Sequence, residues 1–423
     1  MSAQSLRLVV AGQGYVGLPL AMRAVTAGHD VTGLEVSTDR IKRLTAGESF
    51  VEDISSAELR AALDTGRYRV TGAPEDCAGF DVAVITVPTP LEEGVPDLSF
   101  IESAARMLAP QVSAGSLVVL ESTTYPGTTE SLLVPVLNAG SGLVAGRDFR
   151  VGYSPERIDP GNREWTLRTT PKVISGIDDE SLARVDAFYR TIVDHTVPVS
   201  CPKSAELAKL LENTFRHVNV ALVNELAMFA ADLKVDLWEA IDAASTKPFG
   251  FMRFTPGPGV GGHCLPIDPS YLSWTVRQRL GRSFRFVELA NDINDHMPDY
   301  VASRVSHALN RQGLALSRSR VLVLGLAYKR NSSDARESPA AALIGFLLRE
   351  GADVTVADPH VVEQSFLSPC VRRVDLCQDE LERADVVVLV TDHDAFDYEL
   401  VAAHAGCVLD TRHRMEGSHV EHL

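Results

Sequence analysis

The sequence predicts an α/β protein with two Rossmann-like, doubly wound domains joined by a long central helix and a helical middle domain. Three observations predict this fold. An apolar run leads into a Gly-x-Gly-x-x-Gly turn near the amino terminus, and a similar alternation of apolar runs returns after residue 320. Between them, residues 204–233 contain neither Gly nor Pro. We therefore expect an NAD-binding domain over 1–200, a central helical domain over 201–312 and a second Rossmann-like domain over 313–423.

Composition excludes several classes of protein. With 423 residues, the chain is longer than one hydrophobic core usually serves. A net charge of -16 without dense Lys/Arg runs argues against a nucleic-acid partner. No apolar run approaches a membrane span and no signal-peptide pattern precedes the first strand, so a cytoplasmic protein is expected. The six cysteines are scattered without metal-ligand spacing, so no metal site is predicted.

The amino-terminal unit carries a dinucleotide-binding fingerprint. A strand over 6–11 precedes the glycine turn, a helix follows, and a second strand over 31–34 ends at an acid. Glycines allow pyrophosphate to approach the helix amino terminus, and the acid accepts hydrogen bonds from ribose hydroxyls. The candidate cofactor contacts are Gly12, Gly14, Tyr15, Val16, Gly17, Glu35, Arg40, Thr89 and Thr123.

The acid at the end of the second strand favours NAD over NADP. Glu35 would repel a 2'-phosphate, whereas Arg40 could pair with one or could form a salt bridge on the following helix. We give Glu35 more weight because it lies at the strand end itself.

Three polar residues follow later strands of this unit. Thr89 follows a predicted strand within 81–90, and Thr123 follows one within 116–129. The carboxyl ends of strands form the ligand-binding edge of open α/β sheets, although a Thr there is often only a turn or cap residue. Glu156, in the Pro-rich segment 149–161, could activate water or could pair with Arg157.

The stretch 204–233 is predicted to be one long helix. Lys209 and Asn213 are four residues apart and share a face with Glu206, which indicates either a polar site at a domain junction or a solvated charged stripe. Apolar residues occur nearly all round this helix, so we expect a homodimer or higher homo-oligomer.

The segment 255–269, TPGPGVGGHCLPIDP, is predicted to be a rigid loop because proline and glycine exclude regular structure. It holds Cys264 either as a reactive thiol or as a small apolar residue of a turn. Beside an NAD platform, the thiol reading predicts oxidation through a covalent step. Lys209 and Asn213 would stabilise the oxyanions, while Asp268 or Glu156 would handle the proton and the water.

The last third repeats the first fold unit with a different turn. The strand over 321–325 is followed by a polar stretch that carries Lys329 and Arg336, which we expect to contact a phosphorylated substrate. The alternative is that Arg336 pairs with Asp334 or Glu337.

Seven motifs in this order make the chain similar to the UDP-glucose/GDP-mannose dehydrogenase family: GQGYVGLPLA, VPTP, ESTTYPGTT, GYSPERIDPG, AELAKLLENTFRHVN, PGPGVGGHCLPIDP and LGLAYKRNSSDARESP. The resemblance covers nearly the whole chain. It implies four-electron oxidation of a sugar C6 alcohol to a carboxylate with two NAD. It implies the catalytic residues Cys264, Lys209, Asn213, Asp268, Glu156 and Thr123. It also implies the substrate-binding residues Glu156, Lys209, Asn213, Arg253, Gly261, Lys329 and Arg336.

The sequence departs from the UDP-glucose branch of this family in three places. His263 and Ile267 flank the cysteine, Pro160 replaces a second glutamate, and Pro248 stands where that branch has an arginine that reaches a neighbouring subunit, with Lys247 and Arg253 nearby. These features resemble the UDP-N-acetylhexosamine 6-dehydrogenases. UDP-N-acetylglucosamine or its mannosamine epimer is therefore the expected substrate, with UDP-glucose or another nucleotide hexose as the alternative.

Two functions of other classes compete with this interpretation. A two-electron hydroxyacid dehydrogenase would share the amino-terminal unit but needs neither Cys264 nor the second Rossmann-like unit. A non-catalytic NAD-binding regulator would reduce no NAD at all.

Overall fold

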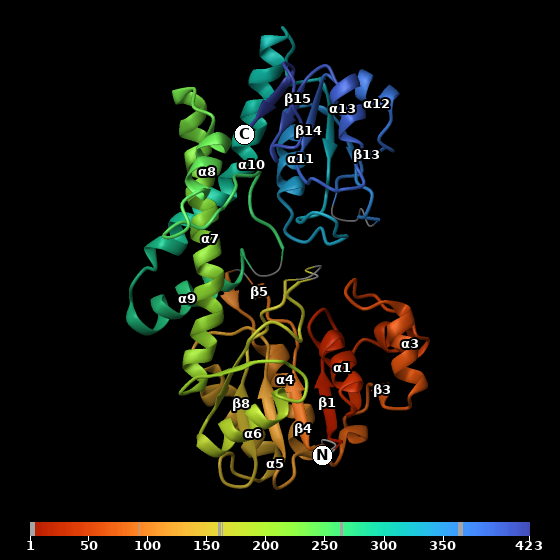
Figure 1. The fold of residues 1–423 in the computed structure, drawn as a ribbon, viewed down its shortest axis with the longest axis vertical. Helices are drawn as coiled ribbons and strands as arrows, with labels where there is room; N and C mark the ends of the chain where they lie inside the picture. Colours follow the sequence, from red (N-terminus) through yellow and green to blue (C-terminus); the bar gives the residue numbers. More distant parts are fainter. Residues whose placement is uncertain (1–4, 93, 160–161, 163, 263–264, 363–366) are drawn as a thin grey trace. The chain divides into compact units, whose positions relative to one another are not determined.

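The computed structural model describes residues 5–92, 94–159, 162, 164–262, 265–362 and 367–423. The chain forms two compact units, Met1–Glu212 and Asn213–Leu423 (Figure 1). The division falls within one helix, α7 (Pro202–Leu233). The three-domain boundaries near residues 200 and 312 therefore stay a prediction.

The first unit is a doubly wound sheet. Its strands are β1 (Arg7–Ala11), β2 (Asp30–Leu34), β3 (Tyr68–Thr71), β4 (Val82–Ile85), β7 (Leu117–Leu120), β8 (Arg150–Tyr153), β9 (Lys172–Gly176) and β10 (Thr196–Pro198). They lie in the order β10-β9-β8-β7-β4-β1-β2-β3. Neighbouring strands are parallel except β8 and β9, which pair antiparallel. A short hairpin, β5 (Leu91–Glu92) with β6 (Val95–Pro96), stands apart from this sheet.

Helices cover both faces of the first sheet because alternate strand residues point to opposite sides. The helices are α1 (Gly17–Thr26), α2 (Thr38–Thr45), α3 (Ser56–Asp64), α4 (Ser99–Leu108), α5 (Val134–Ser141) and α6 (Asp179–Tyr189). Leu8 and Val10 pack with α1, α3 and α6 on one face. Val9 and Ala11 pack with α4 and α5 on the other.

The second unit begins with helices and ends with another parallel sheet. The helices are α8 (Leu237–Ser245), α9 (Asp268–Leu280), α10 (Arg285–Arg311), α11 (Pro339–Arg349), α12 (Gln378–Arg383) and α13 (Tyr398–His404). The strands are β11 (Arg320–Leu324), β12 (Asp353–Ala357), β13 (Arg372–Arg373), β14 (Val386–Leu389), β15 (Val408–Asp410) and β16 (Val420–His422). Their order is β13-β12-β11-β14-β15-β16.

Alternate residues of the second sheet again form two apolar layers. Val321 and Val323 pack with α10 and α11, whereas Leu322 and Leu324 pack with α12 and α13. Two doubly wound units and a long helix between them confirm the predicted fold class. Among the described residues, no helix is long and apolar enough to cross a membrane.

Candidate functional site

The three glycines after β1 have different spatial roles. Gly12 has a φ of +92°, and a Cβ there would lie 2.9 Å from the carbonyl oxygen of Thr86. A Cβ on Gly17 would lie 1.8 Å from the carbonyl oxygen of Gly12. A Cβ on Gly14 would meet no atom within 4 Å. Gly12 and Gly17 therefore close the turn, and Gly14 leaves the space in which a pyrophosphate can approach the backbone.

Glu35 is buried at the carboxyl end of β2, next to this turn. Its carboxylate accepts hydrogen bonds from the backbone N–H groups of Gln13, Val36 and Ser37. Arg40 is 47% exposed and lies 3.6 Å from the same carboxylate, so it has the salt-bridge role that was one of its two alternatives. The turn and the acid together fit the pyrophosphate and ribose of a dinucleotide.

The other candidate cofactor contacts lie around the same strand ends. Tyr15 is exposed within the turn, and Val16 immediately precedes α1. Thr89 is buried after β4, while Thr123 is half-buried after β7. The neighbouring Thr124 donates its hydroxyl to Thr128.

Glu206, Lys209 and Asn213 of α7 are buried, so they do not form a solvated charged stripe. Glu206 does not share a site with Lys209, because its carboxylate accepts hydrogen bonds from the backbone of Gly127 and Thr129 and from the hydroxyl of Thr129. Lys209 is only 8% exposed, and its ammonium has no ion pair or hydrogen bond to another described residue. The ammonium of this largely buried side chain is therefore available to a negatively charged ligand atom.

One turn beyond Lys209, Asn213 contacts one of the predicted catalytic acids. Its side-chain Nδ2 donates to Asp268 Oδ2 at 2.5 Å, and both residues are buried. Asp268 begins α9, directly after the predicted cysteine loop. Cys264 and His263 lie outside the described residues.

The described part of that loop is held by hydrogen bonds to its own unit. Gly257 N donates to Asn224 Oδ1 at 2.9 Å, and Asn224 in turn donates to Asn294 at 2.9 Å. His217 follows in this buried polar chain and bonds Asn291 at 2.7 Å. Burial lowers the pKa of His217, so the imidazole is neutral near pH 7.

Two loop glycines contact the segment that follows β11. Gly262 N donates to the carbonyl oxygen of Arg336 at 3.1 Å. A Cβ on Gly262 would lie 2.7 Å from the Tyr328 ring, and one on Gly261 would lie 2.6 Å from the Glu337 carbonyl oxygen. The cysteine loop and the predicted phosphate-contacting segment therefore pack against each other without space for side chains.

Arg336 is engaged within its own segment. Its guanidinium donates two hydrogen bonds to Asp334, at 2.9 and 2.6 Å, which is the pairing that competed with a phosphate role. Lys329 is half-buried three residues after Leu326. Arg253 pairs with Asp242 of α8 at 2.7 Å, and Lys247 and Pro248 are exposed beside that helix.

Glu156 is embedded in charged contacts that sequence analysis missed. The expected alternative pairing with the Arg157 side chain is wrong, because Arg157 pairs with Glu212 of α7 at 2.7 Å. Instead, Glu156 Oε2 lies 3.7 Å from Lys172 Nζ, which also lies 3.1 Å from Glu121 Oε2. Glu121 and Lys172 stand at strand ends, and that position was the available signal.

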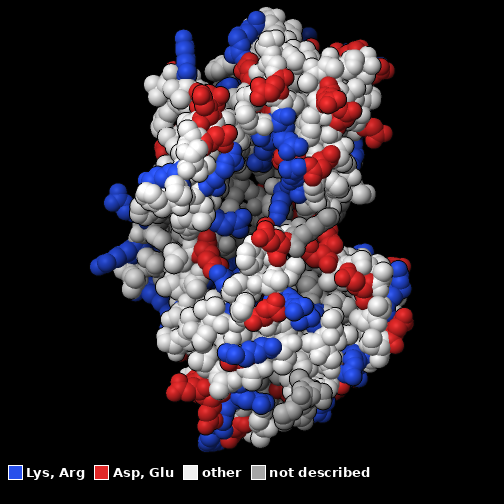
Figure 2. All heavy atoms as spheres, viewed as in Figure 1, with Lys and Arg blue, Asp and Glu red and all other residues white. Residues whose placement is uncertain are grey.

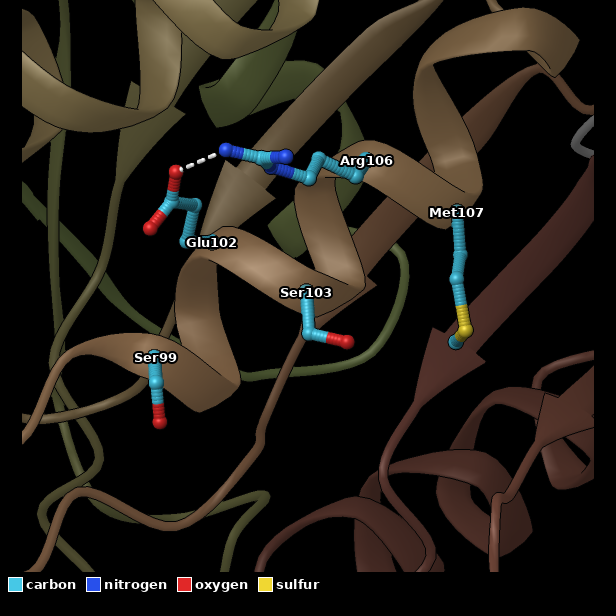
Figure 3. A pocket seen from close by; sticks show the side chains of 5 residues that line it. All are labelled: Ser99, Glu102, Ser103, Arg106 and Met107. Atoms are coloured by element: carbon cyan, nitrogen blue, oxygen red, sulfur yellow. Dashed lines mark hydrogen bonds and ion pairs between the residues drawn. The ribbon is translucent and has the colours of Figure 1, made fainter.

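One surface depression lies apart from the predicted site residues. A depression of about 320 Å³ lies at α4 and is lined by Ser99, Glu102, Ser103, Arg106 and Met107, whose side chains are drawn in Figure 3. None of the predicted site residues lines it, and Arg106 and Glu102 form an ordinary ion pair one turn apart. On the face shown in Figure 2, Lys and Arg are interspersed with Asp and Glu on each unit.

Comparisons with known proteins agree with this arrangement. The chain matches the models of all three domains of the UDP-glucose/GDP-mannose dehydrogenase family. These are the NAD binding domain over 6–193, the central domain over 203–296 and the UDP binding domain over 322–416. A UDP-N-acetyl-D-mannosamine dehydrogenase of Pyrococcus horikoshii is 36% identical over 392 residues, which are 92% of this chain and 90% of that protein. A UDP-N-acetyl-D-glucosamine 6-dehydrogenase of Pseudomonas aeruginosa is 37% identical over 85% of this chain and 84% of its own.

A solved structure shows the same fold over the whole chain. The structure of a UDP-D-ManNAc dehydrogenase from Pyrococcus horikoshii has a TM-score of 0.89 and 34% identity, and the match covers 99% of both chains. The chain belongs to the UDP-glucose/GDP-mannose dehydrogenase family and is an NAD-dependent nucleotide-sugar dehydrogenase.

Proposed function

We propose that this enzyme oxidises the C6 alcohol of a UDP-N-acetylhexosamine to the carboxylate through a thioester on Cys264. The observation that carries the proposal is Lys209, which is 8% exposed and has no hydrogen bond or ion pair to a described residue, one turn from the Asn213–Asp268 pair. A site of this kind stabilises a negative charge that develops on a substrate oxygen. NAD, held at the glycine turn after β1 and at Glu35, would supply the hydride acceptor for both oxidations.

The remaining chemical steps are assigned to different side chains. The Cys264 thiolate adds to the C6 aldehyde to form a thiohemiacetal, and loss of a second hydride converts this to a thioester. Lys209 and Asn213 donate to the oxyanions. Asp268, Thr123 and a water carry the proton released from the C6 hydroxyl.

Hydrolysis of the thioester requires a water and a base. Water adds to the carbonyl carbon, the C–S bond breaks, and the Cys264 thiolate leaves as the carboxylate forms. Glu156 is suited to orient this water, since its Oε2 is buried without a hydrogen-bond partner among the described residues. Lys329, Arg336, Arg253 and Gly261 are proposed to contact the nucleotide sugar.

The N-acetyl group of the substrate is supported by the relatives and by the loop sequence. Two relatives of at least 36% identity are named for UDP-N-acetylmannosamine and UDP-N-acetylglucosamine. We would test this substrate assignment by measuring turnover at the NADH absorbance with four sugars: UDP-glucose, UDP-N-acetylglucosamine, UDP-N-acetylmannosamine and GDP-mannose. A higher kcat/KM for UDP-glucose than for both N-acetyl sugars would replace the proposed substrate by the alternative.

The covalent scheme is tested by Cys264→Ala. We expect the wild-type enzyme to produce two NADH per sugar and Cys264→Ala to produce no uronic acid. Cys201→Ala is the matched control, because Cys201 is a half-buried free thiol at the start of α7. Unchanged two-NADH turnover by Cys264→Ala would contradict the scheme, and one NADH per sugar from the wild type would indicate a two-electron dehydrogenase.

A homodimer through α7 is also proposed. Seven apolar side chains that are 42–73% exposed form a stripe along one face of the helix, at spacings of three, four or seven residues. They are Leu207, Leu211, Phe215, Leu222, Leu226, Phe229 and Leu233. Such a stripe is suited to pack against the same helix of a second copy. Light scattering at micromolar concentration is expected to give twice the chain mass, and Leu226→Glu with Phe229→Glu to give a monomer. A monomeric wild-type protein would remove this proposal.

A cytoplasmic location is proposed from the use of NAD and from the free thiols. Cys77, Cys201, Cys370, Cys377 and Cys407 are unpaired in the structure. Such thiols are typical of a reducing compartment. Fractionation of cells that express the protein would check it.

A further inference from the structure

The residues around Glu156 come together because of the one antiparallel strand pair in the first sheet described above. Glu121 follows β7, and Glu156 follows β8, so both lie at the carboxyl edge of the sheet. β9 runs antiparallel to β8, which brings its first residue, Lys172, to the same edge. The charged side chains of Glu121, Glu156 and Lys172, which come from the ends of three strands, therefore meet at this edge of the sheet.

Lys172 is buried between the two carboxylates. It is 3% exposed, its Nζ lies 3.1 Å from Glu121 Oε2, and the same atom donates to the carbonyl oxygen of Pro155 at 3.2 Å. Its distance to Glu156 Oε2 is 3.7 Å. One ammonium thus serves a fully buried carboxylate and the catalytic candidate above it.

Glu121 is held by the other side of this cluster. Burial raises the pKa of Glu121, while Lys172 opposes that rise. Tyr189 donates its hydroxyl to Glu121 Oε1, and the Lys172 ammonium lies 5.3 Å from the centre of the Tyr189 ring. Burial raises the pKa of Tyr189, so it stays a neutral donor. Lys172 is therefore fixed in position before any ligand binds.

Glu156 has one oxygen engaged and one available. Oε1 accepts from the backbone N–H groups of Arg157 and Ile158. Oε2 faces Lys172 and is buried without a hydrogen bond to a described residue. The Arg157 guanidinium is turned to Glu212, so Lys172 is the cation that faces Glu156 among the described residues.

We propose that Lys172 is a positioning residue that keeps the Glu156 carboxylate ionised and oriented for thioester hydrolysis, with Glu121 and Tyr189 holding Lys172 in place. The inference rests on the proposed role of Glu156. Without the cation, Glu156 and Glu121 would be two neighbouring carboxylates in a buried site, and each would disfavour the ionised form of the other. A protonated Glu156 cannot accept the proton of the attacking water.

The test compares Lys172→Met with Lys172→Arg, using Lys203→Met as the matched control. Lys203 pairs with Glu130 at 2.7 Å on the surface and has no contact with the cluster. Lys172→Met is expected to move the acidic limb of the kcat–pH profile up by about one unit, which lowers kcat about tenfold at pH values below that limb, and to leave KM for NAD and sugar unchanged. Intact-mass spectrometry is expected to show an accumulated sugar–enzyme thioester. Lys172→Arg should restore the limb, and Lys203→Met should match the wild type.

Two further variants separate the possible failures. Glu156→Gln should also accumulate the thioester; if it turns over like the wild type, the role of Glu156 fails and this inference fails with it. If Glu156→Gln accumulates thioester while Lys172→Met keeps the wild-type acidic limb, the positioning role alone is overturned. Should Lys172→Met not fold, Glu121→Gln decides, because Lys172 would then attract Glu156 alone and the limb should move to lower pH. An unmoved limb in Glu121→Gln would overturn the inference.

Discussion

The two Rossmann-like units share one scaffold and differ at one turn. In both sheets the first strand in sequence pairs with the second over five residues in the same register, from Arg7 with Asp30 in one unit and from Arg320 with Asp353 in the other. The first glycine after that strand has a φ of +92° in each unit, at Gly12 and at Gly325. The repeat thus extends to the backbone conformation of the turn.

The units diverge directly after that glycine. In the first, α1 begins at Gly17, five positions beyond Gly12. In the second, α11 begins at Pro339, fourteen positions beyond Gly325, and the intervening segment carries Lys329 and Arg336. A helix start next to the turn offers backbone N–H groups to a phosphate, whereas a long segment offers side chains.

The acid at the end of the second strand also differs in its use. Among the described residues, Glu35 accepts three hydrogen bonds from the backbone. Asp358 accepts five, four from backbone N–H groups and one from buried His393. A carboxylate has about four lone-pair sites, so Asp358 is saturated while Glu35 can accept a ribose hydroxyl. The same topology therefore supports NAD binding in one unit and structural bonding in the other.

The largest expected effect comes from adding a methyl group at the turn. Gly17→Ala and Gly325→Ala each force a Cβ to within 2.5 Å of other atoms, so each should lose about 3 kcal/mol or more of stability. Gly14→Ala has open space and should keep the wild-type Tm, but it should weaken NAD binding. Urea unfolding and NAD titration measure both effects. A stable Gly325→Ala variant would break the equivalence of the two turns.

The next largest effect is expected at Asp358, whose hydrogen-bond acceptor sites are all filled. Although burial opposes ionisation of Asp358, hydrogen bonds from His393 and the backbone hold its pKa well below the usual value. Asp358→Asn should therefore cost about 2 kcal/mol at pH 7. A lowered folded-state pKa means that this stabilisation is present above the unfolded pKa of about 3.9 and is lost as pH falls below it. Urea midpoints of the two proteins should converge toward pH 3; a constant difference would contradict this account.

The third largest effect is expected at Glu35, and it should change the binding of NAD but not that of the nucleotide sugar. Glu35→Gln should weaken NAD binding about tenfold, because it removes a charge-assisted hydrogen bond to ribose, and should leave KM for the nucleotide sugar unchanged. Isothermal titration with NAD and with NADP measures it, and a smaller preference for NAD is expected. Lys42→Gln on α2 serves as a surface control. Equal losses of affinity for NAD and for NADP would show that the effect is structural.

The smallest effect is expected in the second unit. Arg336→Ala should raise KM for the nucleotide sugar about three- to tenfold, since the guanidinium must first leave Asp334 before it can contact a ligand. Arg349→Ala is a matched control at the end of α11. Initial rates at saturating NAD measure the change. An altered NAD affinity with unchanged sugar KM would assign Arg336 to the other ligand.

The elements that depend on local sequence pattern could be predicted from the sequence. The fingerprint around Gly12 and Glu35, the long helix α7 and the repeated sheet are confirmed, because glycine spacing and apolar periodicity determine them directly. It also placed Asn213 and Asp268 in one site, although they are distant in sequence, through the family motifs. The outcome for Cys264 stays a prediction.

What sequence analysis missed depends on the antiparallel β9. Lys172 lies 16 residues after Glu156, and nothing in its local pattern shows that its strand reverses direction. The partners of Glu206 could not be predicted for a related reason. Its helical spacing matches Lys209 and Asn213, but its partners are backbone groups of residues 127 and 129, which no periodicity reveals.

The buried chain from Gly257 through Asn224 and Asn294 to His217 has a consequence for how activity responds to solution conditions. Its members are amides and an imidazole kept neutral by burial, so the chain contains no ion pair. Ionic strength weakens attraction between charges but leaves neutral hydrogen bonds nearly unchanged. The hydrogen bonds that hold the described part of the loop over 255–269 should therefore tolerate high salt, and any salt dependence of turnover then reports on the binding of the charged ligands.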